Sequence, residues 1–296
     1  MLKALIFDVD GTLAETERRG HRIAFNRAFA ETGLDWVWDE ALYGELLAVT
    51  GGKERLRHFI TAHGPEVPVA DAELDACIEN LQALKTRHYI ALVESSGIPA
   101  RPGVIRLMKE ALDAGLRLAI ATTTTADNVY ALLSGSFGPG APEWFEVIGA
   151  GDIVANKKPA PDIYHYVLAE LGLAAEECLA IEDSENGILA SKGAGIPTII
   201  AVNDYTAGQD FTGALVVTDH LGEPEHPLTC LSAAPWEAFS LVDVDALKRL
   251  HERWMSEKRK NRKPGNGLHS SSRSQPCPKN TLSSPSPAHP AQALRP

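Results

Sequence analysis

The stretch Leu5-Ile6-Phe7-Asp8-Val9-Asp10-Gly11-Thr12 opens with an apolar run and stops at two carboxylates. A short apolar run of this kind is typical of a strand buried on both faces of a parallel sheet. Similar runs follow at 116–121, 178–181 and 197–202, with a weaker one at 214–217, and helical patterns lie between them at 103–114, 126–133, 161–171 and 187–194. The alternation predicts an α/β fold, a parallel sheet covered by helices on both faces.

Residues 17–98 interrupt this alternation. Their apolar spacing predicts helices at about 17–33, 39–49, 53–63 and 72–95, with no convincing strand. An insertion of about 80 residues is too long for a loop, so we expect a second, helical domain. The Pro/Gly-rich segment 97–103 is the expected return linker. We therefore place the sheet domain at 1–16 and 99–235, and the helical cap domain at 17–98.

The C-terminal region divides into a helix and a tail. An apolar stripe over 241–255 predicts a helix, which we place at 236–257. Residues 258–296 are rich in Pro, Ser and Asn and poor in apolar residues, so we expect a disordered basic tail. This tail holds eight of the 28 Lys and Arg and no Asp or Glu.

The charge outside the tail is strongly negative. The whole chain carries −11, whereas residues 1–257 alone carry −19. This balance argues against specific nucleic-acid binding, and an anionic ligand would need cations placed locally.

The remaining composition narrows the class of protein. The four cysteines lack the spacing of a disulfide framework or zinc site, and no run approaches 18 apolar residues. We expect a monomer in the cytoplasm that does not span a membrane.

Asp8 and Asp10 follow the first predicted strand directly. Two neighbouring carboxylates repel each other, and a divalent cation with a preference for oxygen ligands, such as Mg²⁺, relieves the repulsion. Gly11 permits the chain to bend there, and the Thr12 hydroxyl is a hydrogen-bond donor. The pair therefore predicts a carboxylate reaction centre with a metal.

Three further segments carry polar groups to the same predicted sheet edge. Thr122–Thr125 offer hydroxyls and free amides to an anion. Lys158 precedes two prolines that stiffen its loop, and we expect it to face the site while Lys157 faces solvent. Glu182 and Asp183 are adjacent acids suited to a metal. Each feature alone has a simpler explanation as a helix cap or surface residue, but together they make the inventory for phosphoryl transfer.

These motifs resemble those of the haloacid dehalogenase superfamily of phosphatases. Six stretches are more closely similar to its CbbY subgroup, which lies near beta-phosphoglucomutase: Phe7–Glu17, Thr50–Arg55, Ala121–Thr124, Gly151–Val154, Lys157–Tyr164 and Glu182–Gly187. The resemblance implies a Rossmann-like core with a helical cap inserted after the first strand. It also implies a phosphatase of a small sugar phosphate, by CbbY resemblance xylulose-1,5-bisphosphate, an inhibitor of the Calvin-cycle enzyme Rubisco.

The resemblance assigns roles to the core motifs. Asp8 matches the nucleophile that forms an aspartyl phosphate, and Asp10 the general acid/base. Thr122 and Lys158 match the groups that hold the phosphoryl oxygens. Mg²⁺ is expected on Asp8, the backbone carbonyl of Asp10, and Asp183, with Glu182 as a second acid beside it.

The expected substrate contacts come from the core and the cap together. Lys53 and Arg55 follow two glycines at a predicted helix start, where free amides add affinity for an anion. Glu17 is expected to accept hydrogen bonds from sugar hydroxyls, whereas His21 and Tyr43 are expected to pack. The full predicted set is Asp8, Glu17, Thr50, Gly51, Gly52, Lys53, Arg55, Lys85, Thr122, Thr123, Thr124, Asn128 and Lys158.

Four other functions remain open. A mutase would use the same aspartyl phosphate and retain a sugar bisphosphate. A phosphonatase would need a cap lysine, such as Lys53, as a Schiff base. A dehalogenase would leave Asp10 without a task, and a non-catalytic sugar-phosphate binding protein would leave four complete motifs unexplained.

Departures from the family fall mainly in the cap. One residue is inserted around 18–20, and the segment 64–74 is longer. We expect the cap to hinge at 13–17 and 97–101.

Overall fold

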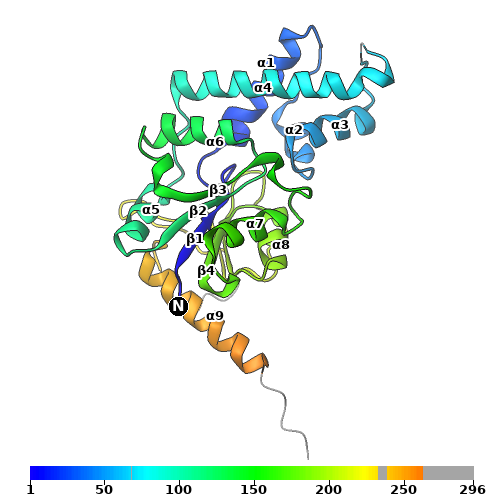
Figure 1. Ribbon diagram of the computed structural model, residues 1–296. Helices are drawn as coiled ribbons and strands as arrows, with labels where there is room; N and C mark the ends of the chain where they lie inside the picture. The colour runs from blue at the N-terminus through cyan, green and yellow to red at the C-terminus, as the bar shows by residue number, and fades with distance from the viewer. Residues whose placement is uncertain (68, 233–238, 263–296) are drawn as a thin grey trace, which may run out of the picture.

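The computed structural model describes residues 1–67, 69–232 and 239–262. Its centre is a six-stranded parallel sheet in the order β3-β2-β1-β4-β5-β6 (Figure 1). The strands are β1 (Ala4–Phe7), β2 (Arg117–Ala121), β3 (Phe145–Gly149), β4 (Cys178–Glu182), β5 (Thr198–Ala201) and β6 (Val216–Thr218). The predicted α/β fold, Rossmann-like with helices around a parallel sheet, is confirmed.

Helices cover both faces of the sheet, so successive side chains of β1 pack into different cores. Leu5 and Phe7 pack in a cluster with α5 (Val104–Asp113), α6 (Ala126–Leu132) and α9 (Val244–Arg262). Ala4 and Ile6 pack in another, with α7 (Asp162–Leu171) and α8 (Glu185–Gly193). Alternation between two covered faces explains why the central strands read as continuous apolar runs.

The strand β3 was not predicted, and its burial shows why. Only Phe145 and Gly149 are buried, and Glu146 is exposed. As an edge strand beside β2, it needs no continuous apolar run, and Pro142 just before it favours a loop interpretation.

The insertion, residues 17–98, forms a helical layer beyond the carboxyl ends of the strands (Figure 1). Its helices are the π-helical turn η1 (Glu17–His21), α1 (Arg22–Glu31), α2 (Glu40–Leu46), α3 (Gly52–His63), the short η2 (Asp71–Glu73) and α4 (Leu74–Ser96). The extra residue noted at 18–20 falls within η1, where one added residue widens a helical turn. The insertion buries an aromatic cluster of its own around Trp38 and Phe29, which supports the prediction of a second domain.

Four short helical turns complete the described fold. They are η3 (Leu133–Phe137), η4 (Pro142–Trp144), η5 (Gly151–Ile153) and η6 (Ala175–Glu177). No helix among the described residues has the length and apolar character needed to cross a membrane.

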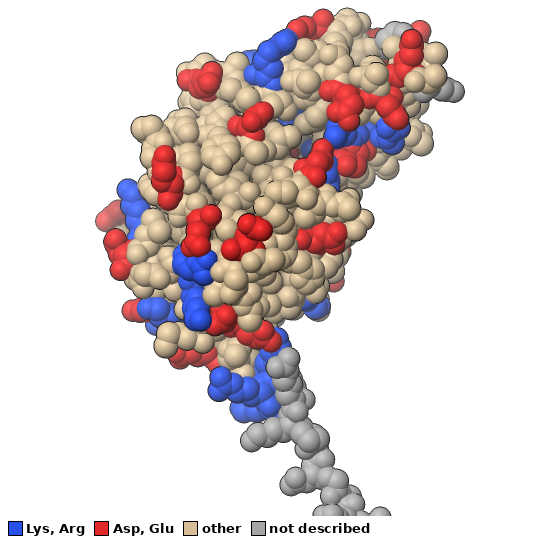
Figure 2. Space-filling view, in the orientation of Figure 1, with Lys and Arg blue, Asp and Glu red and all other residues tan. Residues whose placement is uncertain are grey.

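The C-terminal helix differs from the prediction at both ends. It begins at Val244 and ends at Arg262, so the first five residues of the predicted tail are helical. Lys258 contributes to this extension, because its ammonium lies 2.9 Å from Glu176 and 4.5 Å from the centre of the Trp254 ring. Basic side chains gather at this end of the molecule (Figure 2). Residues 263–296 lie outside the described residues, so their predicted disorder stays a prediction.

The two chain segments that join the insertion to the sheet lie side by side. Ala14 and Ala100 form an isolated antiparallel bridge, and the Arg101 amide donates to the Leu13 carbonyl at 2.9 Å. The predicted hinge residues therefore belong to one paired connection, and hinge motion there stays a prediction.

Arg101 ties this connection to the sheet. Its buried guanidinium donates to four backbone carbonyls, those of Gly11, Ala201, Val202 and Asp219, and lies 3.0 Å from Glu15. One side chain thus holds the loop after β1 to the ends of β5 and β6.

We expect Arg101→Met to lower the free energy of unfolding by about 3 kcal/mol or more, because it leaves several buried carbonyls without donors. Urea titration would measure the change. Arg117→Met is the control: Arg117 pairs with Glu146 at the surface, where such a pair is worth about 1 kcal/mol at most. Equal losses in the two variants would contradict this role of Arg101.

Candidate active site

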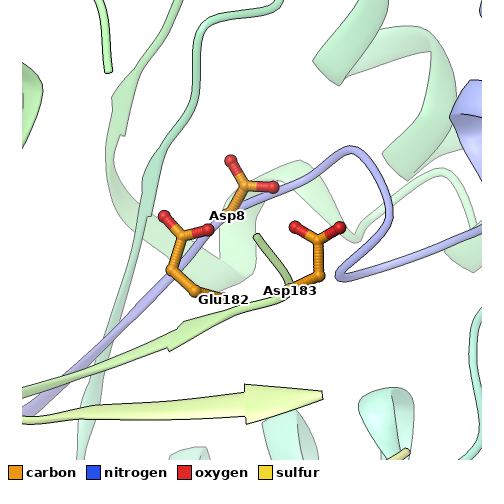
Figure 3. Close-up of side chains that lie close together, drawn as sticks. All are labelled: Asp8, Glu182 and Asp183. Carbon is orange, nitrogen blue, oxygen red and sulfur yellow. The ribbon is translucent and has the colours of Figure 1, made fainter. Parts of the chain in front are cut away.

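Asp8, Glu182 and Asp183 come together where β1 and β4 end (Figure 3). In the register of the two strands Phe7 lies opposite Ile181, so the residues that follow emerge side by side. All three carboxylates are buried, and one oxygen from each lies within 4.8 Å of the others. The structure thus brings Asp8 together with two acids that lie more than 170 positions later in the chain.

The chain bends at Gly11 to fit this cluster. Gly11 has a φ of +85°, and a Cβ there would lie 2.4 Å from Asp183 Oδ2. Asp183 accepts hydrogen bonds from the Thr12 hydroxyl at 3.3 Å and the Asn203 amide at 2.6 Å. The role of Asn203 was not predicted, although this residue directly follows the apolar run 197–202.

The acids are electrostatically costly without a cation. Burial raises the pKa of Asp8 well above its usual value, with further increases from Glu182 and Asp183 against the opposing charge of Lys158. Burial and then Glu182 raise the pKa of Asp183 to about 7. Buried carboxylate oxygens with excess negative charge fit a hard divalent cation, so the residues present suit Mg²⁺.

Lys158 is the buried cation of the cluster. Its ammonium lies 2.6 Å from Asp8 Oδ1 and 2.6 Å from Glu182 Oε1, and the Tyr164 hydroxyl also donates to Glu182 Oε1. Burial opposes the charge on Lys158, but the two carboxylates raise its pKa above the usual value. The predicted approach of Lys158 to the acids is therefore seen, with Tyr164 as a partner that the sequence analysis did not single out.

Glu182 is placed differently from the two aspartates. It is fully buried and lines no cavity at the sheet edge, whereas Asp8 and Asp183 both line a small cavity between the sheet edge and the insertion. Glu182 thus contacts Lys158 and Tyr164, whereas Asp8 and Asp183 are the acids of the cluster that a metal ion in the smaller cavity could reach.

The Asp10 side chain points to a different set of partners. Its Oδ1 accepts a hydrogen bond from Thr16 at 2.6 Å and lies 2.8 Å from His21 Nε2. Burial raises the pKa of Asp10, but His21 and Thr16 outweigh it and bring the pKa to about 2. The carboxylate is outside the metal-type cluster, so only the backbone of Asp10 remains as its predicted metal ligand. His21 stacks on Tyr89, as packing predicts, but its contact with Asp10 was not predicted.

Two adjoining cavities lie between the sheet edge and the insertion. The smaller, about 70 Å³, is lined by Asp8, Thr122, Lys158 and Asp183 among others. The larger, about 410 Å³, is lined chiefly by the insertion and by the loops after β2 and β3. Asp10, Glu17, Arg55 and Thr123 line both, so one end of a ligand can reach the acids while the other lies in the larger cavity.

Most of the predicted substrate contacts line these cavities. Those that do are Asp8, Glu17, Thr50, Gly51, Gly52, Lys53, Arg55, Lys85, Thr122, Thr123, Thr124 and Lys158. Asn128 does not: it is buried, and its amide donates to Thr124 Oγ1 at 3.0 Å. The predicted direct contact of Asn128 with substrate is therefore wrong for this structure, in which its side chain holds the Thr124 hydroxyl.

Arg55 is fixed from several sides. Its Nε lies 3.3 Å from the carbonyls of Leu46 and Val49, and its Nη1 donates to the Tyr43 hydroxyl at 3.1 Å. That hydroxyl in turn donates to Glu17. Tyr43 was predicted to pack only; it does pack, but it also bridges two residues of the cavity wall.

Lys85 brings a second buried cation into the larger cavity. Its ammonium lies 5.3 Å from the centre of the Phe25 ring and 5.6 Å from that of Tyr89. Burial lowers the pKa of Lys85 to about 8 against the opposing charges of Asp10 and Glu17. Arg55 and Lys85 thus supply local positive charge in a strongly acidic chain.

We expect Mg²⁺ to raise the melting temperature of the protein, because an ion that binds only the folded state adds about 2.7 kcal/mol at 100 times its Kd. Asp183→Asn should abolish most of this rise, since it removes a charged ligand from the cluster. Differential scanning calorimetry with and without Mg²⁺ measures both, and Asp113→Asn on the exposed face of α5 is the control. An unchanged Mg²⁺ response in Asp183→Asn would contradict the assignment.

Known proteins of one family are similar to this chain. A haloacid dehalogenase-like hydrolase model matches residues 2–195. The chain is 49% identical to Protein CbbY of Cupriavidus necator over 84% of this chain and 97% of that relative. It is 41% identical to a CBBY-like protein of Arabidopsis thaliana, over 83% of this chain and 74% of that protein.

Solved structures agree with these relatives. A crystal structure of CbbY from Rhodobacter sphaeroides with phosphate has a TM-score of 0.70 and 47% identity, covering 74% of this chain and 95% of that one. A variant of the same protein was solved with xylulose-1,5-bisphosphate, with a TM-score of 0.69 and 46% identity over the same shares of the two chains. A beta-phosphoglucomutase from Clostridium difficile, 18% identical with a TM-score of 0.63, covers 86% of this chain and all of that one, and shares the fold.

Proposed function

Since the chain belongs to the haloacid dehalogenase-like hydrolases, we propose that it is a Mg²⁺-dependent phosphatase of a small sugar bisphosphate. The observation that carries the proposal is the pairing of buried Asp8 with Lys158 at 2.6 Å beside Asp183, at the floor of a cavity that continues to Arg55. The favoured substrate is xylulose-1,5-bisphosphate, because a CbbY structure with 46% identity was solved with that compound.

The proposed first step is attack by Asp8 on the phosphorus atom. One carboxylate oxygen of Asp8 forms the new P–O bond, the bond from phosphorus to the sugar oxygen breaks, and an aspartyl phosphate results. Lys158, Thr122 and the Thr123 amide would hold the non-bridging oxygens. Mg²⁺ on Asp8, the Asp10 carbonyl and Asp183 would supply charge neutralisation for the transferring group.

Asp10 is the proposed acid and base. The lowered pKa of Asp10 favours its carboxylate form, which suits the base step, in which it takes a proton from the water that hydrolyses the aspartyl phosphate. For the acid step the carboxylate must first take up a proton, which it then gives to the departing sugar oxygen. Thr16 and His21 hold its carboxylate where both cavities meet. This position suits a group that must reach the bond between phosphate and sugar.

A bisphosphate explains the cations remote from Asp8. The phosphate that does not react would lie in the larger cavity, near the start of α3 and within reach of Arg55 or Lys85. Glu17, which accepts a hydrogen bond from the Tyr43 hydroxyl, lines both cavities and is placed to meet sugar hydroxyls. A monophosphate would have no second phosphate to place in this region.

Two alternative activities are less well supported. A phosphonatase needs a neutral lysine amine, but Lys53 is hydrogen-bonded to Asp152 and Glu79, and these bonds raise its pKa. A mutase shares the aspartyl phosphate, but the beta-phosphoglucomutase from Clostridium difficile is only 18% identical to this chain and shares the fold alone. Incubation with a hexose 1-phosphate, assayed for the isomerised product, distinguishes a mutase.

We expect phosphate release from xylulose-1,5-bisphosphate with a kcat/KM well above that for simple sugar monophosphates. Asp8→Asn should lower the rate by at least about 10³-fold, because it removes the nucleophile. A panel of sugar phosphates with Mg²⁺ measures the preference, and circular dichroism of the variant checks its folding. Equal kcat/KM for bisphosphates and monophosphates would reject the bisphosphate assignment but leave a phosphatase.

We expect kcat/KM for the bisphosphate to fall as the pH rises through about 8, because Lys85 is charged only below its lowered pKa. Lys85→Arg keeps a charge at every accessible pH, so it should remove this fall. A monophosphate, lacking the second anion, is the control substrate. A fall that is the same in Lys85→Arg, or the same with both substrates, would show that another group is responsible.

A further inference from the structure

Two lysines and an aspartate meet at the rim of the larger cavity. Lys53 of α3 places its ammonium 2.8 Å from Asp152 Oδ2, and Lys157 of the core places its ammonium 2.8 Å from Asp152 Oδ1. Each lysine also has an acid on the insertion: Lys53 lies 3.2 Å from Glu79, and Lys157 lies 2.9 Å from Glu54. The cluster therefore joins the insertion to the loop after β3.

Lys157 is built into this cluster. We expected it to face solvent, but only 13% of its side chain is exposed. Its stem runs against Gly51, where a Cβ would lie 2.9 Å from Lys157 Cδ and the φ of +90° also favours glycine. The glycine before α3 thus leaves room for a lysine that arrives from the core.

Asp152 is the replaceable member of the cluster. Its side chain is 58% exposed, so its ion pairs are largely solvated and each is worth little. Lys53, Lys157 and Asp152 all line the same cavity as Arg55 and Lys85. A phosphate dianion offers two lysines more charge and more acceptor oxygens than one carboxylate does.

We propose that Lys53 and Lys157 form a clamp for the substrate's second phosphate, and that Asp152 is the resident counter-ion which this phosphate displaces. This inference rests on the proposed bisphosphate phosphatase. The preference for a bisphosphate would then depend on one lysine from each side of the cavity, Lys53 of the insertion and Lys157 of the core. The second phosphate would contact both parts of the protein at once. A monophosphate lacks the group that would displace Asp152.

Steady-state kinetics on the full chain test the clamp. Lys157→Met and Lys53→Met should each raise the KM for the bisphosphate about tenfold, with little change in kcat or in the KM for a monophosphate. Asp152→Asn should act in the opposite direction and lower the bisphosphate KM about threefold, because a competing anion is removed. Lys109→Met and Asp113→Asn, both exposed on α5, are the matched controls and should change neither.

Two results would overturn the clamp. If Asp152→Asn raises the KM as the lysine variants do, Asp152 maintains the site and does not compete for it. If Lys157→Met changes both substrates equally, its role is general packing.

Failure of the proposed function can be distinguished from failure of the clamp. If the proposed function is wrong, the wild-type enzyme will show no preference for bisphosphates over monophosphates. The clamp is then still tested by calorimetric titration of ribulose 1,5-bisphosphate and ribulose 5-phosphate into proteins carrying Asp8→Asn. Lys157→Met should weaken only the bisphosphate, and equal affinities with and without Lys157 would reject the clamp.

Discussion

The buried ammonium of Lys158 is the interaction on which the site depends. It lies 2.6 Å from both Asp8 and Glu182, at the centre of a cluster that would otherwise be three mutually repelling acids. One lysine cannot balance three carboxylates, so the cluster retains an excess of negative charge that a divalent cation would offset. The geometry of β1 and β4 enforces this proximity, because parallel strands in register deliver their following residues to the same edge.

A division of charge between the two layers follows from this arrangement. The sheet edge concentrates acids, whereas the insertion contributes the cations Lys53, Arg55 and Lys85 to the opposite wall, together with the acids Glu17 and Glu79. An elongated ligand with an anion at each end fits such a cavity, since one phosphate would meet the metal and Lys158 while the other meets the insertion. The net negative charge of the chain is therefore compatible with the proposed anionic substrate, because cations line the cavity in which its second phosphate would lie.

Buried strands and strand-end acids could be predicted from the sequence, whereas an edge strand and some side-chain partners could not. The central strands were predictable because burial on both faces demands apolar residues in succession, whereas β3 at the sheet edge carries only two buried residues. The motif acids were predictable from their positions after strands. Asn128 was misplaced because a helix start alone does not tell whether a side chain meets the cavity or, as here, the hydroxyl of Thr124.

The sequence by itself determined the α/β class, the helical insertion after the first strand and the residue types of the reaction centre, since these follow from local patterns of burial and charge. Only the tertiary structure decided the partners: His21 on Asp10, Tyr164 on Glu182, and Lys157 on Asp152 beneath the insertion. These contacts join residues from different elements, and their formation depends on how helices pack over the sheet edge. That packing is set by many weak contacts spread over the whole chain, which no short motif records.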